Sequence, residues 1–63
     1  MATYKILDLV HRERDETVME VVPASEAEAI ASRRYHEEGY YAEVLSPVFS
    51  SREEALTYVA SLW

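Results

Sequence analysis

The chain has no cysteine, one glycine and two prolines among its 63 residues. Without cysteine it has no disulfide, no thiolate ligand for a metal ion and no thiol nucleophile. A single glycine excludes a glycine-rich phosphate-binding loop, because such a loop needs several positions where the backbone comes close to the phosphate. The scarcity of glycine and proline also leaves little room for long flexible loops.

Positive charge is scarce too, with six Lys and Arg against twelve Asp and Glu and a net charge of −6. Binding to nucleic acid or to an anionic membrane needs Lys and Arg, so this balance argues against both partners. It permits a basic protein partner, including a protein surface that normally holds nucleic acid. The other interpretation is that the charge keeps a small protein soluble.

Long apolar runs are absent, although 49% of the residues are hydrophobic, which is typical of a folded domain. No stretch approaches the length of a transmembrane helix, and the first residues do not resemble a secretory signal peptide. We therefore expect a cytoplasmic protein and a complete small gene product.

Residues with catalytic potential are few. The only imidazoles are His11 and His36, and His36 is followed by two glutamates, not by the Glu-x-x-His of a zinc site. No serine lies in a Gly-x-Ser-x-Gly turn, and the acids match no calcium-binding loop. The sequence thus predicts no catalytic residue, no cofactor and no metal site. An enzyme would need a composite site between subunits, built from His36, Arg33 or Arg34 and glutamates.

One short pattern, V-x-x-S-x-x-E-A-[IL], occurs at residues 22–30 and again at residues 48–56. It contains a capping box, in which a serine hydroxyl accepts a hydrogen bond from the backbone N–H three residues later and the glutamate there reaches back to the serine. The pattern predicts that helices begin at Ser25 and Ser51. Gly39 stands where the first helix should end in a left-handed cap.

The hydrophobic pattern predicts strands over residues 3–10, 17–22 and 40–45, a hairpin loop over 11–16, and helices over 25–38 and from 51 to the end. The first strand is mostly apolar, interrupted by Lys5 and Asp8, which indicates apolar contacts on both faces or a bulge near Asp8. In the first helix Arg34 falls inside the apolar stripe and should turn outward toward Glu38. The stripes expected to be buried are Ala27, Ile30, Ala31 and Tyr35 in the first helix, and Ala55, Leu56, Val59, Ala60 and Trp63 in the second.

The predicted order β-β-α-β-α gives an α+β fold, formed by one small domain over residues 1–63. A hairpin followed by a right-handed crossover places the first strand in the middle of a three-stranded antiparallel sheet of order 2-1-3. One or both helices would then cover one face of this sheet. A domain of this size buries only about 60% of the surface of its unfolded chain, so oligomerisation would add stability.

Aromatic residues make up 11% of the chain. Tyr and Trp are favoured at protein interfaces because they bury a large area with little loss of entropy. The alternative is that they fill the core, which we favour for Tyr4 and Tyr35 and which stays open for Tyr41 and Trp63. The strands also carry more apolar side chains than one sheet face can bury. The interface residues predicted from this surplus are Tyr40, Tyr41, Glu43, Leu45, Tyr58, Leu62 and Trp63.

Residues 18–62 resemble a SPOR domain, a small peptidoglycan-binding module that repeats a strand and a Ser-capped helix. Residues 49–56, Phe-Ser-Ser-Arg-Glu-Glu-Ala-Leu, look like the start of the second helix of that family. The chain departs from the pattern at Val48, where the family has glycine, and it lacks the intervening hairpin. The resemblance covers helix capping and periodicity and transfers no site residue.

Together these features predict a small non-enzymatic protein-binding module that forms a homodimer or a small homo-oligomer. Viral inhibitors of host proteins, encoded by phages or mobile elements and including anti-defence proteins, have this build. Such an inhibitor acts by surface occlusion or by acidic mimicry of nucleic acid. The alternative is a self-assembling structural protein, or one that sequesters a small ligand in the seam between paired sheet edges.

Overall fold

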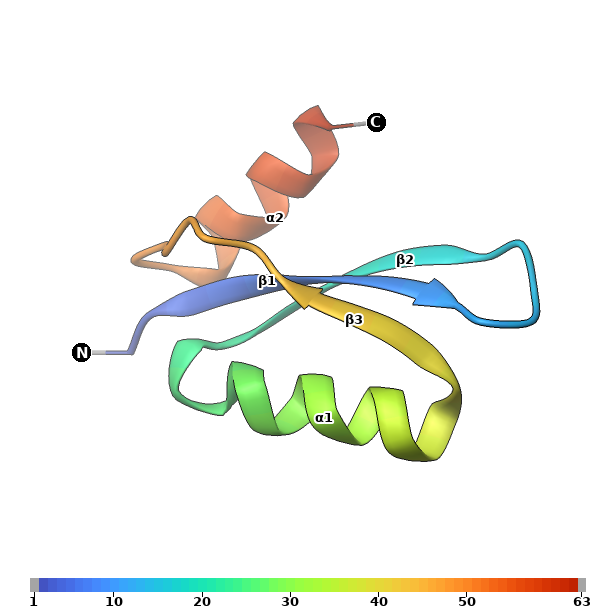
Figure 1. Cartoon of the computed structure of the whole chain (residues 1–63). Helices are drawn as coiled ribbons and strands as arrows, with labels where there is room; N and C mark the ends of the chain where they lie inside the picture. The colour runs from blue at the N-terminus through green and yellow to red at the C-terminus, as the bar shows by residue number, and fades with distance from the viewer. Residues whose placement is uncertain (1, 63) are drawn as a thin grey trace.

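The computed structural model describes residues 2–62 (Figure 1). The strands are β1 (Tyr4–His11), β2 (Thr17–Pro23) and β3 (Tyr40–Val44). The helices are α1 (Ala27–Glu38) and α2 (Arg52–Ser61), and a 3-10 turn, Ala24–Glu26, precedes α1. The order β-β-α-β-α confirms the predicted α+β fold.

β1 lies in the middle of the sheet and runs antiparallel to both neighbours, in the predicted order β2-β1-β3. Leu7 pairs with Glu20 of β2 and with Val44 of β3, and the register continues past Asp8 without a bulge. Ile6 and Leu7 are both completely buried although they are neighbours in the chain. Successive side chains of a strand point to opposite faces, so both faces of the sheet must be covered at this point.

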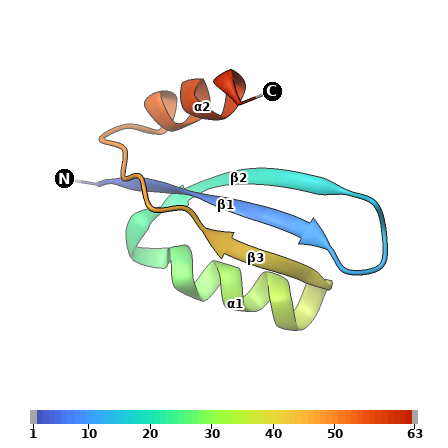
Figure 2. The ribbon, with the colours of Figure 1, turned by 45° about the horizontal axis from the view of Figure 1, so that its top comes forward.

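The two helices lie on opposite faces of the sheet (Figures 1 and 2). The buried residues on the α1 side are Leu7, Leu9, Val22 and Ala27, and those on the α2 side are Ile6, Val21 and Ala55. The sequence left open whether one or both helices cover one face, and the structure places one helix on each face. Both sets of alternating side chains in β1 are apolar at its start, so each face needs an apolar layer of its own.

α2 begins at Ser51, as the capping pattern predicted. The Ser51 hydroxyl oxygen accepts a hydrogen bond from the backbone N–H of Glu54 at 3.1 Å. The Glu54 carboxylate turns back to Ser50, not to Ser51, and accepts from the Ser50 backbone N–H at 3.1 Å and from its hydroxyl at 2.7 Å. The Ser51 hydroxyl and the Glu54 carboxylate thus accept hydrogen bonds from backbone N–H groups at the start of α2, which have no partner within the helix.

The same prediction for Ser25 was wrong. Ser25 lies inside the 3-10 turn, α1 begins at Ala27, and neither the turn nor α1 has a side-chain cap at its start. The chain begins to turn directly after Pro23, and the backbone N–H of Ala24 donates to the Thr3 carbonyl at 2.8 Å. The sheet therefore sets where the turn begins, before Ser25 is reached.

α1 ends as expected at Gly39, which adopts a left-handed conformation with φ of 80° and donates its backbone N–H to the Arg34 carbonyl. Of the stripe expected to be buried, Ala27 is buried, Ile30 and Ala31 pack on the core, and Tyr35 remains 40% exposed. The Tyr35 ring instead lies 6.2 Å from the Tyr41 ring, centroid to centroid.

α2 touches the sheet with a narrower stripe than predicted. Ala55 is buried and Val59 packs on the same cluster, whereas Leu56 and Ala60 are exposed. Trp63 lies outside the described residues. Within residues 2–62, neither helix has the length and apolar character needed to cross a bilayer.

Candidate protein-binding face

α2 covers only one end of its side of the sheet. Ala55 and Val59 pack on Ile6 and Val21, close to where β1 begins and β2 ends. Farther along the strands the same face continues with side chains that are mostly exposed, although Met19 packs on the α2 cluster and Asp8 is half-buried. Because cross-strand partners share a face, the register assigns six residues to this surface. We call it the open face, and it comprises Asp8, Val10, Thr17, Met19, Tyr41 and Glu43.

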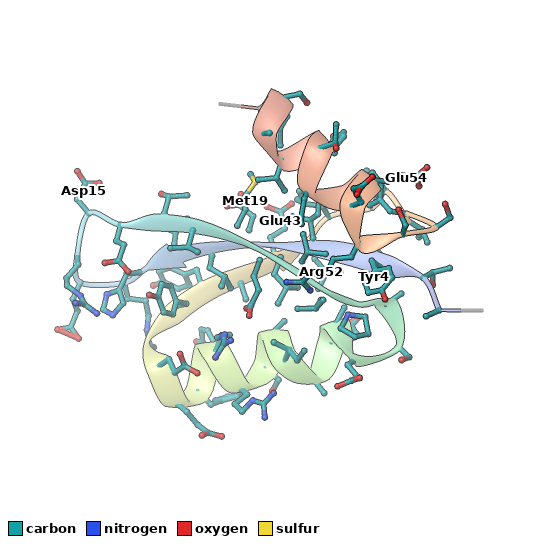
Figure 3. All side chains as sticks on the ribbon, turned by 180° about the vertical axis from the view of Figure 1, so that it is seen from behind. Tyr4, Asp15, Met19, Glu43, Arg52 and Glu54 are labelled. Carbon is teal, nitrogen blue, oxygen red and sulfur yellow. The ribbon has the colours of Figure 1, made fainter. Side chains whose placement is uncertain are left out.

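Two carboxylates face each other on the open face. Asp8 of β1 and Glu43 of β3 are direct cross-strand partners, and Met19 of β2 pairs with Asp8 from the other side. Figure 3 shows Met19 and Glu43 projecting from the sheet toward the side on which α2 lies. Like charges directly opposite each other destabilise a sheet, so this pair carries a cost that the core does not explain.

The Asp8 carboxylate is the more constrained of the two. Its Oδ1 atom is buried and accepts no hydrogen bond from any residue within 2–62. The ion pairs formed in that part of the chain involve Arg34 on the opposite face, and none reaches Asp8 or Glu43. A buried acceptor without a donor is unfavourable, so the position of Asp8 in the sheet costs stability.

Apolar side chains frame these acids. Val10 is 41% exposed and Tyr41 is 58% exposed. They are cross-strand partners and form the next pair on this face after Asp8 and Glu43. Leu62, at the end of α2, is 48% exposed. An apolar frame around an unpaired acid is typical of a surface that is covered when a partner binds.

The α1 side of the sheet holds a different kind of polar cluster. Arg34 reaches from α1 across to β2, where its Nη2 donates to Glu20 Oε2 at 2.9 Å, and it also pairs with Glu38 as predicted. The hydrogen bond to Glu20, followed by that to Glu38, raises the pKa of Arg34 above its ordinary value. A cavity of about 300 Å³ lies beside this network.

Tyr40 borders the same cavity. Its hydroxyl donates to Glu16 Oε1 at 2.7 Å, and holding the phenol proton in this bond raises the pKa of Tyr40. The ring also packs edge-on against His11 at 5.0 Å between centroids. Because the polar groups along the cavity hydrogen-bond to one another, we interpret this cluster as a structural link between α1, β2 and the hairpin.

A second hollow lies beside α2. It is lined by Phe49, Glu53, Glu54, Thr57 and Tyr58. The Phe49 and Tyr58 rings pack against each other at 5.2 Å between centroids. Glu54 is already engaged with Ser50, whereas the Glu53 carboxylate forms no ion pair within residues 2–62, and the two rings form an aromatic wall.

Comparisons with known proteins identify no relative. No protein-family model matches the chain, and no curated protein and no solved structure matches it significantly. The resemblance to SPOR domains therefore gains no support from a family match.

The interface residues predicted from the sequence separate into groups in the structure. Tyr41 and Glu43 lie on the open face, and Leu62 and Tyr58 are exposed on α2. Tyr40 lies on the opposite face and is held by Glu16. Leu45 is half-buried and packs on the α2 cluster, and Trp63 falls outside the described residues. The predicted set is therefore not one surface.

Sequence reasoning missed Asp8 and Val10 as parts of this face. The signal was present, because Asp8 interrupts an otherwise apolar central strand. The sequence predicts either apolar contacts on both faces of this strand or a bulge near Asp8, and neither interpretation identifies Asp8 as a surface acid. Only the register with Glu43 shows that two acids meet there.

The two histidines have local contacts. His11 Nδ1 accepts from the backbone N–H groups of Glu13 and Arg14 at 3.1 and 3.2 Å and so holds the hairpin turn. His36 packs edge-on against Tyr35 at 4.9 Å between centroids. Within residues 2–62 no three His, Asp or Glu side chains gather in a way that would hold a metal ion.

Proposed function

We propose that this protein is a small non-enzymatic protein-binding module that engages its partner with the open face. The observation that carries the proposal is the facing pair of Asp8 and Glu43, framed by the exposed Val10 and Tyr41. A protein that folds only for its own stability gains nothing from two unpaired acids in the middle of a sheet face.

An inhibitory role fits this surface. An acidic, partly apolar face on a 63-residue chain can occlude a basic site of a larger protein, or occupy a groove that normally holds nucleic acid. A viral or mobile-element inhibitor of a host defence protein, acting in the cytoplasm, needs no more than one such face. This assignment rests on size, charge and the geometry of the open face.

The proposal is tested by affinity capture with matched valine variants. Val10→Ser alters the open face, whereas Val48→Ser alters an exposed valine in the segment between β3 and α2. We expect the wild type and Val48→Ser to retain the same defined host protein, identified by mass spectrometry, and Val10→Ser to lose it. Equal capture by both variants would contradict the role of the open face.

A second candidate function is self-assembly through the sheet edges. The backbone of Leu45 donates to Ile6, and Arg12 donates to Gly39, so alternate residues of β3 bond to β1. The backbone groups of Tyr40, Ala42 and Val44 consequently point outward, away from the sheet, and are available to a second β3 strand. A homodimer formed in this way would leave the open face free for a partner.

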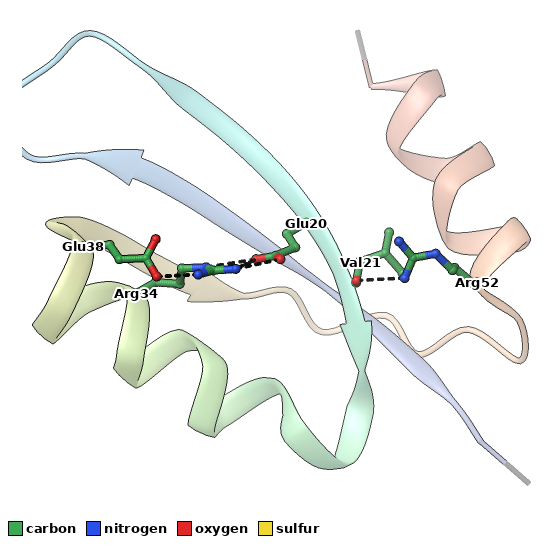
Figure 4. Close-up of polar contacts among 5 residues, drawn as sticks. All are labelled: Glu20, Val21, Arg34, Glu38 and Arg52. Atoms are coloured by element: carbon green, nitrogen blue, oxygen red, sulfur yellow. Dashed lines mark hydrogen bonds and ion pairs between the residues drawn. The ribbon is translucent and has the colours of Figure 1, made fainter.

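The β2 edge is less available for such pairing. Arg52 of α2 donates its Nη1 to the outward carbonyl of Val21 at 3.4 Å (Figure 4). Self-assembly through β3 is tested by Ala42→Pro, which removes an outward N–H that β1 does not use. Native mass spectrometry should show a dimer for the wild type and a monomer for the variant. A monomeric wild type at high protein concentration would eliminate this candidate, and a co-purifying small molecule would favour ligand sequestration.

A further inference from the structure

We infer that the acid pair of the open face receives a lysine or arginine side chain from a basic amphipathic helix of another protein. This inference rests on the proposed function and specifies the partner that the face fits. The cation would lie between Asp8 and Glu43, and the apolar side of the helix would lie over Val10 and Tyr41.

The charge of the partner follows from the two carboxylates. As direct cross-strand partners, Asp8 and Glu43 hold two negative charges within one side chain's reach of each other. A lysine or arginine between them would turn this repulsion into two charge-assisted hydrogen bonds. Asp8 Oδ1 is buried and lacks a donor among residues 2–62, so the cation would bind the other oxygen of the Asp8 carboxylate together with Glu43.

The helical form of the partner follows from the layers of the fold. α1 packs mainly on β3 on one side of the sheet, whereas α2 packs mainly on β2 and β1 on the other (Figure 3). Two packed helices lie about 8–10 Å apart, so a second helix fits beside α2, above β3. There it would complete the layer that α2 leaves unfinished.

A second copy of this chain is the wrong occupant for this face. The same patch of another copy would bring its own Asp8 and Glu43 against the first pair, and each chain already carries a net charge of −6. An isologous contact would therefore gather four carboxylates without a cation. Complementary charge favours a basic helix instead.

The inference is tested by NMR titration of the 15N-labelled protein with two synthetic amphipathic helices of about 18 residues. One carries leucine and lysine, and its twin carries glutamine in place of every lysine. We expect the lysine peptide to shift the amide signals of Asp8, Val10, Tyr41 and Glu43, and the glutamine peptide to leave them in place. Shifts confined to another surface would overturn both this inference and the proposed use of the open face.

Charge variants separate the acid pair from general attraction to an acidic protein. Asp8→Asn and Glu43→Gln preserve shape, and the amide spectrum of each shows whether it is folded. Each variant should bind the lysine peptide about tenfold more weakly than the wild type, because each removes one charge-assisted hydrogen bond. Glu28→Gln is the matched control, since Glu28 is exposed on α1 across the sheet, and it should change the affinity by less than about twofold.

Two results would overturn the acid-pair inference while leaving the proposed function in place. One is that Asp8→Asn and Glu28→Gln weaken the binding of the lysine peptide equally, while the peptide still shifts the amide signals of the open face. The other is equal binding of the lysine and glutamine peptides there. Absence of any shift at millimolar lysine peptide would overturn the helix as the occupant, and capture of a host protein sensitive to Val10→Ser would then show that the face binds something else.

Discussion

Arg34 of α1 and Glu20 of β2 form an ion pair that spans the groove between the helix and the edge strand (Figure 4). Nε and Nη2 of Arg34 donate to the Glu20 carboxylate at distances of 2.9–3.2 Å. The pair is partly shielded, with 26% of the Arg34 side chain and 33% of the Glu20 side chain exposed. It ties α1 to β2.

Replacing Arg34 should therefore weaken the fold. We expect Arg34→Met to lower the free energy of unfolding by about 1 kcal/mol, because two glutamates lose their cation while the apolar stem is kept. Arg34→Lys should recover only part of this loss, since lysine lacks the planar fork that engages both Glu20 oxygens. Urea unfolding of the three proteins measures the effect, and equal stability of wild type and Arg34→Met would show that the pair is dispensable.

The two serines of the repeated pattern should respond differently to the same substitution. Ser51→Ala removes the hydroxyl that accepts from the Glu54 N–H and should cost about 1 kcal/mol of stability. Ser25→Ala should change stability far less, because Ser25 lies within the 3-10 turn and caps no helix. Thermal unfolding of the two alanine variants provides the comparison. Equal losses would mean that Ser25 caps α1 in solution.

The Tyr40 phenol should titrate at a higher pH than an ordinary tyrosine. Its hydrogen bond to Glu16 raises the pKa from the ordinary value of 10.0. The stability that this bond contributes is complete below the pKa of the unfolded chain and is lost as pH rises through the higher pKa of the folded state. Tyrosinate absorbance of wild type minus that of Tyr40→Phe isolates the titration. Glu16→Gln should lower the pKa of Tyr40 again. A difference curve that Glu16→Gln leaves unchanged would show that Glu16 does not cause the shift.

Neutralising one member of the acid pair should stabilise the free protein. We expect Glu43→Gln to raise the free energy of unfolding by about 0.5 kcal/mol at neutral pH, because it removes a like charge directly opposite Asp8. The gain should shrink as salt is added, since screening weakens the repulsion in the wild type. Glu13→Gln, in the exposed hairpin loop, makes the same change in net charge and serves as the control. A Glu43→Gln variant less stable than wild type would mean that Glu43 has a stabilising partner.

Much of the fold could be predicted because its signals are local. The strand at residues 3–10 is mostly apolar, and such a strand belongs in the centre of a sheet. Gly39 can adopt positive φ without steric cost, so it marks the end of α1. Ser51 and Glu54 are three residues apart, and their hydrogen bond depends on that spacing alone.

The candidate site could be predicted only in part, because its members are distant in the chain. Tyr41 and Glu43 were found as residues hard to place in a small core, and both lie on the open face. Tyr40 belonged to the same predicted set, yet its strand position points it to the opposite face, where Glu16 accepts from its hydroxyl. Neighbouring residues of a strand point to opposite faces, so Tyr40 and Tyr41 do not share one surface, and only the packing of the helices decides which of the two faces stays open.

The sequence by itself determined the order of elements, the central strand, the end of α1 and the start of α2, since each depends on residues close together in the chain. The tertiary structure decided which face each helix covers, that Ser25 caps no helix, and that Asp8 and Glu43 meet in the sheet. Those outcomes depend on strand register and on which apolar surfaces can be buried together. Both are properties of contacts between distant segments, so they arise only when the chain has folded.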